Sequence, residues 1–457
     1  MTNVHATTST TPPYRRAHGL HPLALIAVYV VLGLAPLALA ALQPQSGGNV
    51  WRELSSGLVM VGFAMLLSQF LLSGRFRQVS GQVGIDLTMR FHQLAALTVL
   101  AFIVVHPLLF AVPRLEDGPG AALATLQRMF TSGGLRSGVI AWVLLVLLVP
   151  LAVWRDRLPG PYELWRLSHG VGAALVAGLS AHHTLRVGTY SEDPWLAGFW
   201  LLLTGIALAS LAHVYVVEPL LQRHSPWRVT GNRKVADTMW EVTIEPDDGR
   251  GLDYAAGQFV WLNLGHSPFS LTEHPFSISS APASGPHLAL TIKESGDFTD
   301  HIGKVSAGTV AYLDGPHGTF SLQGRDAKRI VLIAGGVGFA PVIGILRQLA
   351  AERHPHPVHI VYGNRVESQI LYRDEIEALA RRLDLRVDLV LSEPPAGWTG
   401  KVGELTPQVL RTCLASPSPD ALYLVCGPVA MMDGVEASLI GMGVPPRRIV
   451  SERFKYD

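Results

Sequence analysis

The sequence predicts a multi-domain membrane protein: a six-helix transmembrane bundle, then a small antiparallel β-barrel, then an α/β domain with a parallel sheet. Three observations support this fold class. The mean hydropathy of +0.30 is high for a soluble chain, and the apolar residues gather in the first half. The second half opens with short alternating segments separated by glycine and proline. Apolar strands that alternate with helical patterns follow, which is typical of a parallel sheet.

Composition excludes several classes of protein. The 457 residues carry a formal net charge of +1, so the sequence gives no reason to expect nucleic-acid binding. The only cysteines are Cys413 and Cys426, which are too few for an iron–sulfur cluster and no sign of a disulfide framework. The polar N-terminus runs directly into a full-length apolar span, so we expect no cleavable signal peptide.

Six stretches within residues 1–222 are long and apolar enough to span a bilayer. They are Leu20–Leu42, Leu54–Leu72, Met89–Val112, Gly138–Trp154, Leu167–Leu185 and Trp195–Val217. Arginines flank the spans on one side of the membrane, at Arg15, Arg16, Arg75, Arg77, Arg155, Arg157, Arg166, Arg223 and Arg228. By the positive-inside rule we expect a multi-pass protein of the cell inner membrane, with lipid around the bundle and the soluble half in the cytoplasm.

Histidines mark the third and fifth spans. His92 and His106 are 14 residues apart, and His169 and His182 are 13 apart. Each spacing corresponds to about 20 Å along a helix axis. Ionisable groups are costly in lipid, and neutral imidazole is a good iron ligand. Two such helices side by side could hold two b-type haems stacked across the membrane, so we predict these four histidines as the metal ligands.

The loop charges pair His92 with His169 on the cytoplasmic side and His106 with His182 on the outer side. Fourteen residues nearly complete whole helical turns, whereas thirteen do not. His183 therefore fits a straight helix better than His182, which would need a bend or a bulge. The outer ligand stays open between these two histidines. A haem with histidine on both faces has no open position, so it passes electrons rather than binding oxygen.

Two domains are expected after the bundle, at residues 226–325 and 328–457. The first contains the short strands of a barrel: Glu241–Glu245, Gln258–Leu264, Phe276–Ser279, His287–Ile292 and Thr309–Leu313. The second contains the strands of an α/β sheet: Ile330–Ala334, Val358–Tyr362, Arg386–Val390 and Leu422–Cys426.

Two segments of this half have the features of phosphate-binding turns. Gly296 follows Lys293 and precedes residues that can open a helix, which presents backbone N–H groups to an anion, although an ordinary turn has the same pattern. The second segment has three glycines between a strand and a helical pattern: Gly335, Gly336 and Gly338. This context predicts a dinucleotide site, although the spacing departs from the standard G-x-G-x-x-G fingerprint.

Taken together, these features resemble the ferric reductase and NADPH oxidase superfamily over nearly the whole chain and in the family's order. His274-Pro275-Phe276-Ser277 is similar to the family's flavin-binding motif. The resemblance places Phe276 against the flavin of FAD and Ser277 at its reactive edge. The residues that it assigns to the FAD pyrophosphate are Lys293, Gly296 and Thr299. Those that it assigns to the NAD(P)H loop are Gly335, Gly336, Gly338 and Pro341.

Two more motifs belong to this resemblance. Cys426-Gly427-Pro428 matches the family's segment beside the nicotinamide. Glu452-Arg453-Phe454 is similar to the C-terminal motif whose aromatic ring covers the flavin, and a short extension follows Phe454. The resemblance therefore implies catalytic roles for Ser277, Cys426 and Phe454.

The implied function is transmembrane electron transfer. NAD(P)H releases a hydride, whereas a haem accepts one electron at a time, so the flavin must lie between them. We expect the order NAD(P)H, FAD, inner haem, outer haem and an acceptor outside the cell. Dioxygen giving superoxide is the first candidate, and a ferric chelate is the alternative. A cytochrome-b carrier for a protein partner is a second alternative, but it would need no nucleotide domain, so we infer no obligate protein partner.

Two arginines bear on the choice of substrates. Arg365 follows a predicted strand where the adenosine ribose should lie, and a guanidinium there could bind the 2′-phosphate of NADPH bidentately. Alternatively, Arg365 pairs with Glu367 or Asp374. We expect NADPH, with NADH possible. Arg52 either lies near the outer haem, where its charge favours superoxide, or serves as an interfacial anchor.

Overall fold

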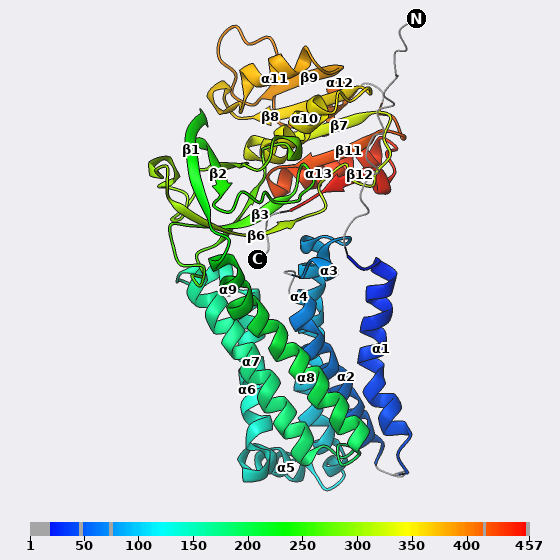
Figure 1. Ribbon diagram of the computed structural model, residues 1–457. Helices are drawn as coiled ribbons and strands as arrows, with labels where there is room; N and C mark the ends of the chain where they lie inside the picture. Colours follow the sequence, from blue (N-terminus) through cyan, green and yellow to red (C-terminus); the bar gives the residue numbers. More distant parts are fainter. Residues whose placement is uncertain (1–18, 45–48, 73–75, 415–416, 454–457) are drawn as a thin grey trace, which may run out of the picture.

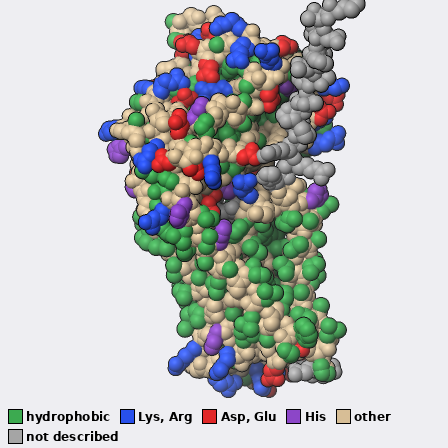
Figure 2. All heavy atoms as spheres, viewed as in Figure 1, with side chains coloured by type: hydrophobic (Ala, Val, Ile, Leu, Met, Phe, Trp, Pro, Cys, Tyr) green, Lys and Arg blue, Asp and Glu red, His purple; other side chains and the backbone are tan. Residues whose placement is uncertain are grey.

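The structure is a computed structural model that describes residues 19–44, 49–72, 76–414 and 417–453. Arg15, Arg16, Arg75 and Phe454 lie outside the described residues. Figure 1 shows a bundle of long helices with two β-rich domains stacked at one end of it. Figure 2 shows hydrophobic side chains over the bundle, whereas charged side chains gather over the β-rich domains and at the far end of the helices.

The helical half follows the long apolar runs of the sequence. Its helices are α1 (Pro22–Ala41), α2 (Val50–Leu72), α3 (Arg77–Ser80), α4 (Ile85–Ala111), α5 (Pro119–Thr131), α6 (Arg136–Val153), α7 (Tyr162–Val187), α8 (Pro194–Ala212) and α9 (Glu218–Arg223). A π-helical turn, His213–Val217, joins α8 to α9. In the described part of the chain, five helical segments are long and apolar enough to cross a membrane, namely those that contain α1, α2, α4, α6 and α8. The chain is therefore a membrane protein.

Helix α7 is the remaining long helix, with 26 residues. It packs against α6 and α8. His169, His182 and His183 interrupt its apolar length, so its composition is less apolar than that of the five others. The prediction of six spans is thus supported by length and composition for five helices, and the crossing by α7 stays a prediction.

Small and aromatic side chains hold α7 in place. Ala64 of α2 and Ala177 of α7 are fully buried, which lets these helices approach closely. Trp200 of α8 lies beside Phe63 of α2, with 4.9 Å between the ring centres. These residues share one core cluster, so the helix that carries His169 is fixed against α2 and α8.

The first β-rich domain is a curled antiparallel sheet. Its strands are β1 (Trp227–Ala236), β2 (Met239–Pro246), β3 (Phe259–Leu264), β4 (His274–Ser277), β5 (Leu288–Lys293) and β6 (Val310–His317), in the order β4-β3-β6-β1-β2-β5. The edge strands β4 and β5 approach each other where Ile278 pairs with Leu290 in an isolated bridge. The described residues therefore form a curled sheet, and the closed barrel that we predicted is not confirmed. Strand β1 was not predicted, because charged residues and Gly231 interrupt its apolar alternation.

The second β-rich domain has the predicted parallel sheet. Its strands are β7 (Ile330–Gly335), β8 (Val358–Asn364), β9 (Leu385–Leu391), β10 (Lys401–Val402), β11 (Leu422–Cys426) and β12 (Ile449–Ser451), in the order β10-β9-β8-β7-β11-β12. Its helices are α10 (Phe339–Ala351), α11 (Arg373–Ala380), α12 (Pro407–Cys413) and α13 (Val429–Gly441). The order of the strands reverses between β7 and β11, and ligands of such sheets bind at the carboxyl ends of strands beside this reversal.

An ion pair and an apolar contact help to attach the curled sheet to the bundle. Arg166 of α7 forms an ion pair with Glu273 at 2.6 Å, and both side chains are largely buried. Ile85, at the start of α4, packs against Phe259 and Trp261 of β3. Because Glu273 directly precedes β4, the ion pair holds the first residue of that strand above the end of α7.

Candidate electron-transfer site

The inner histidines of α4 and α7 lie close together. The ring centres of His92 and His169 are 6.4 Å apart. Both rings line a cavity of about 700 Å³ between the helices, a size within the range of roughly 300–1,000 Å³ that cofactor pockets have. The indole of Trp165 stacks on His169 with 5.4 Å between ring centres, which fixes the orientation of that imidazole.

This arrangement fits an iron ion held between two imidazoles. A metal–imidazole bond is about 2 Å and the ring centre lies roughly 1 Å beyond the nitrogen, so two imidazoles on one ion have ring centres roughly 6 Å apart. The Nδ1 atoms of His92 and His169 are buried without a hydrogen-bond partner among the described residues. Two histidines with unpaired ring nitrogens beside an apolar cavity are arranged for a haem, and for packing alone they would be costly.

The outer histidine, His106, is held in a tautomer that can bind a metal. The hydroxyl of Ser55 donates to the carbonyl oxygen of His106 at 2.9 Å. The hydroxyl oxygen of Ser55 also lies 2.7 Å from Nδ1 of His106. Because a hydroxyl has a single proton, Nδ1 must donate in the second contact, which leaves Nε2 as the free lone pair. Metal-binding histidines are commonly oriented in this way by a partner at the other nitrogen.

The two adjacent histidines of α7 have different environments. His183 is half-buried beside α6. Its Nδ1 is buried without a partner among the described residues. A Cβ added at Gly138 of α6 would lie 2.4 Å from that atom, so the glycine makes room for the ring. His182 is exposed instead, and its Nδ1 lies 2.9 Å from the hydroxyl of Ser137. Of the two rings, only that of His183 is half-buried with an unpaired nitrogen, and the identity of the outer ligand stays a prediction.

The predicted flavin motif forms strand β4. Phe276 and His274 both contact Phe298, with 6.0 Å and 4.4 Å between ring centres. Burial lowers the pKa of His274, so its imidazole is neutral at physiological pH. Pro275 is half-buried and Ser277 is buried. A rigid strand with a neutral ring and a buried hydroxyl is suited to holding an aromatic cofactor.

The predicted pyrophosphate turn follows β5. The hydroxyl of Thr299 accepts from the backbone N–H of Ser295 at 2.7 Å, and the N–H of Thr299 donates to the carbonyl of Gly296 at 3.0 Å. Lys293 and Gly296 are exposed at the turn. The turn is thus internally braced while its lysine stays available to an anion.

The glycine loop of the parallel sheet lies where β7 and β11 end. A Cβ at Gly338 would lie 2.5 Å from the carbonyl oxygen of Cys426, so only glycine allows the two loops to approach this closely. The carbonyl of Gly336 accepts from the hydroxyl of Tyr362 at 3.1 Å. Pro341 is buried in the first turn of α10. The structure thus brings the Gly335–Pro341 loop together with Gly427 and Pro428, which follow β11.

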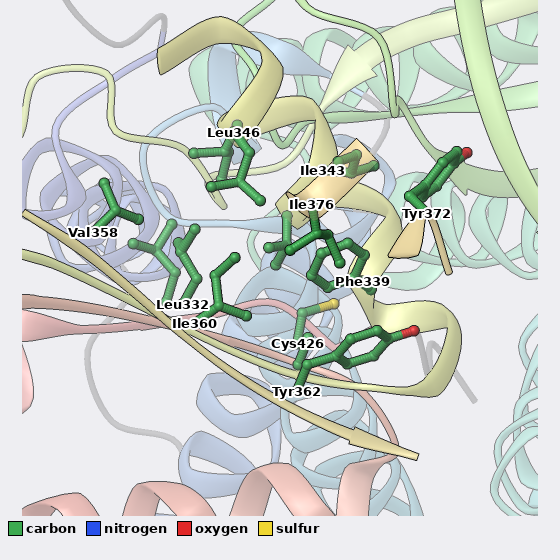
Figure 3. Packing of buried hydrophobic residues seen from close by; sticks show 14 of the residues in the cluster. Leu332, Phe339, Ile343, Leu346, Val358, Ile360, Tyr362, Tyr372, Ile376 and Cys426 are labelled. Carbon is green, nitrogen blue, oxygen red and sulfur yellow. The ribbon is translucent and has the colours of Figure 1, made fainter. Parts of the chain in front are cut away.

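Cys426 lies in the core of this domain, in the same cluster as Phe339 and Tyr362 (Figure 3). Burial raises the pKa of its thiol to about 12, with Glu452 contributing, so the thiol is neutral. Glu452 is itself buried, and burial raises its pKa to about 8. Its carboxyl accepts from the N–H of Thr319 at 3.0 Å. Phe454, the third predicted catalytic residue, lies outside the described residues.

Arg365 follows β8 and is exposed. Glu367, one of its two alternative partners, pairs with Arg373. No ion pair of Arg365 is found among the described residues, so its guanidinium is open to a ligand.

Two features of the site were not recognised from the sequence. The sequence marks Arg166 only as one of the charges that flank the spans, whereas in the structure its pairing with Glu273 joins the bundle to β4. The sequence places Trp261 only within a strand, whereas in the structure it lines the cavity of the inner histidines. For the pair of Arg166 with Glu273, the available signal was the position of Glu273 next to the flavin motif. Nothing in the sequence indicated that Trp261 reaches the cavity.

Comparisons with known proteins agree with this architecture. A ferric reductase like transmembrane component matches residues 58–180, an FAD-binding domain matches residues 232–336, and an oxidoreductase NAD-binding domain matches residues 332–437. Fold and site thus define a transmembrane flavin oxidoreductase with FAD- and NAD(P)H-binding domains. The chain belongs to the ferric reductase and NADPH oxidase superfamily, as its sequence predicted.

The soluble half is also similar to individual proteins. It is 32% identical over 236 residues to ferredoxin–NADP reductase B of Sorangium cellulosum. This match spans 50% of this chain and 96% of the relative. It is 33% identical over 171 residues to NADH-cytochrome b5 reductase 1 of Candida albicans, over 36% of this chain and 58% of the relative. The solved structure of a flavohemoglobin from Malassezia yamatoensis matches with a TM-score of 0.49 and 19% identity, over 80% of this chain and 98% of that one. The predicted oxidoreductase class is confirmed.

Proposed function

We propose that the protein carries electrons from cytoplasmic NADPH through FAD and two b-type haems to dioxygen on the outer side of the cell inner membrane, giving superoxide. The observation that best supports this path is the inner histidine pair, His92 and His169, with ring centres 6.4 Å apart beside a cavity between the helices. One NADPH supplies two electrons and each dioxygen accepts one, so two superoxide ions form for each NADPH.

A flavin accepts the two electrons of a hydride together and releases them singly, and haem iron with two histidine ligands carries one electron at a time. In this proposal His92 and His169 hold the inner haem, and His106 with His183 holds the outer one. Ser55 orients His106 by accepting a hydrogen bond from its Nδ1–H.

The soluble half would bind the two nucleotides. Phe276 and Ser277 of β4 contact the flavin, while Lys293, Gly296 and Thr299 hold its pyrophosphate. The loop of Gly335, Gly336, Gly338 and Pro341 receives the NADPH pyrophosphate, and Cys426, Gly427 and Pro428 lie beside the nicotinamide. Phe454 would cover the flavin. The preference for NADPH rests on the exposed Arg365, since the similar proteins include both an NADP and an NADH enzyme.

The choice of dioxygen as acceptor rests on the outer end of α2. Arg52 donates to the hydroxyl of Thr189 at 3.2 Å. It lies one helical turn before Ser55, which contacts His106. A guanidinium one helical turn from the residue that contacts the outer histidine would favour the formation of an anion there.

The test uses the purified full-length protein in detergent. We expect two haems and one FAD per chain, flavin reduction before haem reduction when NADPH is added without oxygen, and rapid reoxidation by dioxygen with superoxide as product. A protein with fewer than two haems contradicts the electron path. Faster reoxidation by ferric citrate than by dioxygen would instead identify a ferric-chelate reductase.

A further inference from the structure

The cavity of the inner histidines is not lined by the bundle alone. Most of its walls come from α2, α4, α6, α7 and α8, but Trp261 belongs to strand β3 of the curled sheet. Its side chain is 9% exposed. A large aromatic side chain from the soluble half therefore forms part of a pocket whose ligands come from the membrane half.

Trp261 meets the same face of α4 that carries the inner ligand. Its cluster includes Ile85 and Met89 of α4. Residues 85, 89 and 92 are spaced by four and three positions, so they lie along one face of the helix. The indole thus covers the two turns that precede His92, at the end of the cavity nearest the soluble half.

Trp261 also shares a sheet face with two residues of the flavin motif, Pro275 and Ser277. In the antiparallel pairing of β3 with β4, Trp261 is opposite Pro275 and Phe259 is opposite Ser277. Residues directly opposite each other, and residues two apart on one strand, lie on the same face of a sheet. Trp261, Pro275 and Ser277 are therefore on one face, while Phe276 lies on the other face and packs toward the core of the sheet.

We propose that Trp261 closes the inner haem site from the flavin side and is the side chain that couples the two cofactor sites. This inference rests on the proposed function. The indole keeps water out of the cavity at the junction of the two halves and places an aromatic ring between the sheet face that carries Ser277 and the inner histidines. The buried pair of Arg166 with Glu273 holds β4, the neighbouring strand, against the same end of the bundle.

The exclusion of water should shift the midpoint potential of the inner haem, and the sign of this shift can be predicted and measured. Haem iron carries one more positive charge when oxidised than when reduced, and an apolar environment disfavours the charged form. Loss of the indole lets water reach the cavity, which stabilises the oxidised haem. The midpoint potential of the inner haem should therefore fall, and that of the outer haem should not change.

The experiment compares Trp261→Leu and Trp261→Phe with the wild type, all as full-length protein loaded with FAD and haem. Trp398→Phe is the matched control, because this tryptophan is half-buried in the second β-rich domain and bonds to the carbonyl of Lys401. Spectroelectrochemical titration gives the two haem potentials. Rapid mixing with NADPH without oxygen gives separate rates for flavin reduction and haem reduction.

We expect Trp261→Leu to lower one haem potential and to slow haem reduction, with flavin reduction unchanged. Trp261→Phe keeps an aromatic ring and should lie between the leucine variant and the wild type, whereas Trp398→Phe should match the wild type. If the leucine variant fails to load its cofactors, the phenylalanine variant carries the comparison. A two-haem wild type whose folded Trp261 variants keep both potentials and both rates overturns the inference and leaves the proposed function intact. A wild type without haem contradicts the proposed function itself.

Discussion

The adjacent residues His182 and His183 of α7 have different environments. His182 is exposed beside Ser137, whereas His183 is half-buried against Gly138. In a membrane, the buried and unpaired imidazole is the one that requires a functional explanation.

We predict different haem contents for leucine variants at these two positions. His183→Leu should lose one of two haems, because His106 then lacks a partner, and His106→Leu should lose the same one. His182→Leu should keep both haems and serves as the matched control. Leucine is compatible with a membrane helix, so insertion is preserved. Haem-to-protein ratios in detergent test this. The opposite pattern, with haem lost only from His182→Leu, would restore His182 as the outer ligand.

A second residue-scale prediction concerns Glu452, whose pKa burial raises to about 8 from an ordinary value of 4.5. The folded protein keeps a proton there that the unfolded chain loses, so this carboxyl lowers the free energy of unfolding as pH rises from about 5 to about 8. Glu452→Gln keeps a carbonyl oxygen for the N–H of Thr319 and removes the titration. The thermal midpoint of FAD release should therefore fall less across this pH range in the glutamine variant.

The control for this experiment is Glu377→Gln, an exposed position of α11. It should reproduce the pH profile of the wild type. Parallel profiles for Glu452→Gln and the wild type would show that Glu452 is not protonated in the folded protein.

At the scale of elements, the ends of parallel strands concentrate the nucleotide-binding features. Strands β7 and β11 end in glycine loops that touch, and β8 ends just before Arg365. The carboxyl ends of parallel strands lie at one edge of the sheet, so the strands alone bring these features together, whether or not the loops touch.

Arg365→Ala should raise the KM for NADPH by about 10-fold to 100-fold, the range expected for a hydrogen bond to a charged group. The KM for NADH should stay nearly constant, since NADH has no 2′-phosphate. Steady-state rates with both nucleotides test this, and Arg381→Ala at the exposed end of α11 is the control. Equal losses for both nucleotides would count against a 2′-phosphate contact.

At the scale of the whole molecule, a buried polar network joins the two β-rich domains. Arg347 of α10 donates to Glu241 of β2 at 2.9 Å and to the carbonyl of Ser279 at 2.8 Å. Tyr372 also donates to Glu241, at 2.7 Å. Burial alone would raise the pKa of Glu241, but the charge of Arg347 and hydrogen bonds from neighbouring side chains hold it below its ordinary value. The network thus fixes the NAD(P)H-binding domain against the flavin domain.

Arg347→Leu should destabilise the soluble half by about 3 kcal/mol, at the low end for a broken buried ion pair, because Glu241 keeps Arg233 and Tyr372 as partners while Glu375 also loses Arg347. The thermal midpoint of FAD release should fall by on the order of 10 °C. Arg228→Ala, which removes an ion pair between Arg228 and Asp247 at the surface, should change it little. An unchanged midpoint for Arg347→Leu would show that the domains are held together by other contacts.

Much of the fold was predictable because its signals are local. Every strand predicted in the soluble half exists, and the predicted spans fall within the long helices to within a few residues. Strand β1 was missed because Gly231 and charged residues disrupt its alternation, although its partners in the sheet supply its hydrogen bonds. The curl of the sheet depends on how distant strands meet, so closure could not be read from strand lengths.

The sequence alone determined the membrane half, the order of the domains and the histidine-bearing helices, because hydropathy, periodicity and turn residues act within a few positions along the chain. Only the tertiary structure decided that His183 is half-buried against Gly138 while His182 is exposed, that Arg166 pairs with Glu273, and that Trp261 reaches the inner cavity. These features depend on the rotation of one helix against another and on contacts between residues far apart in the sequence. No local pattern specifies either.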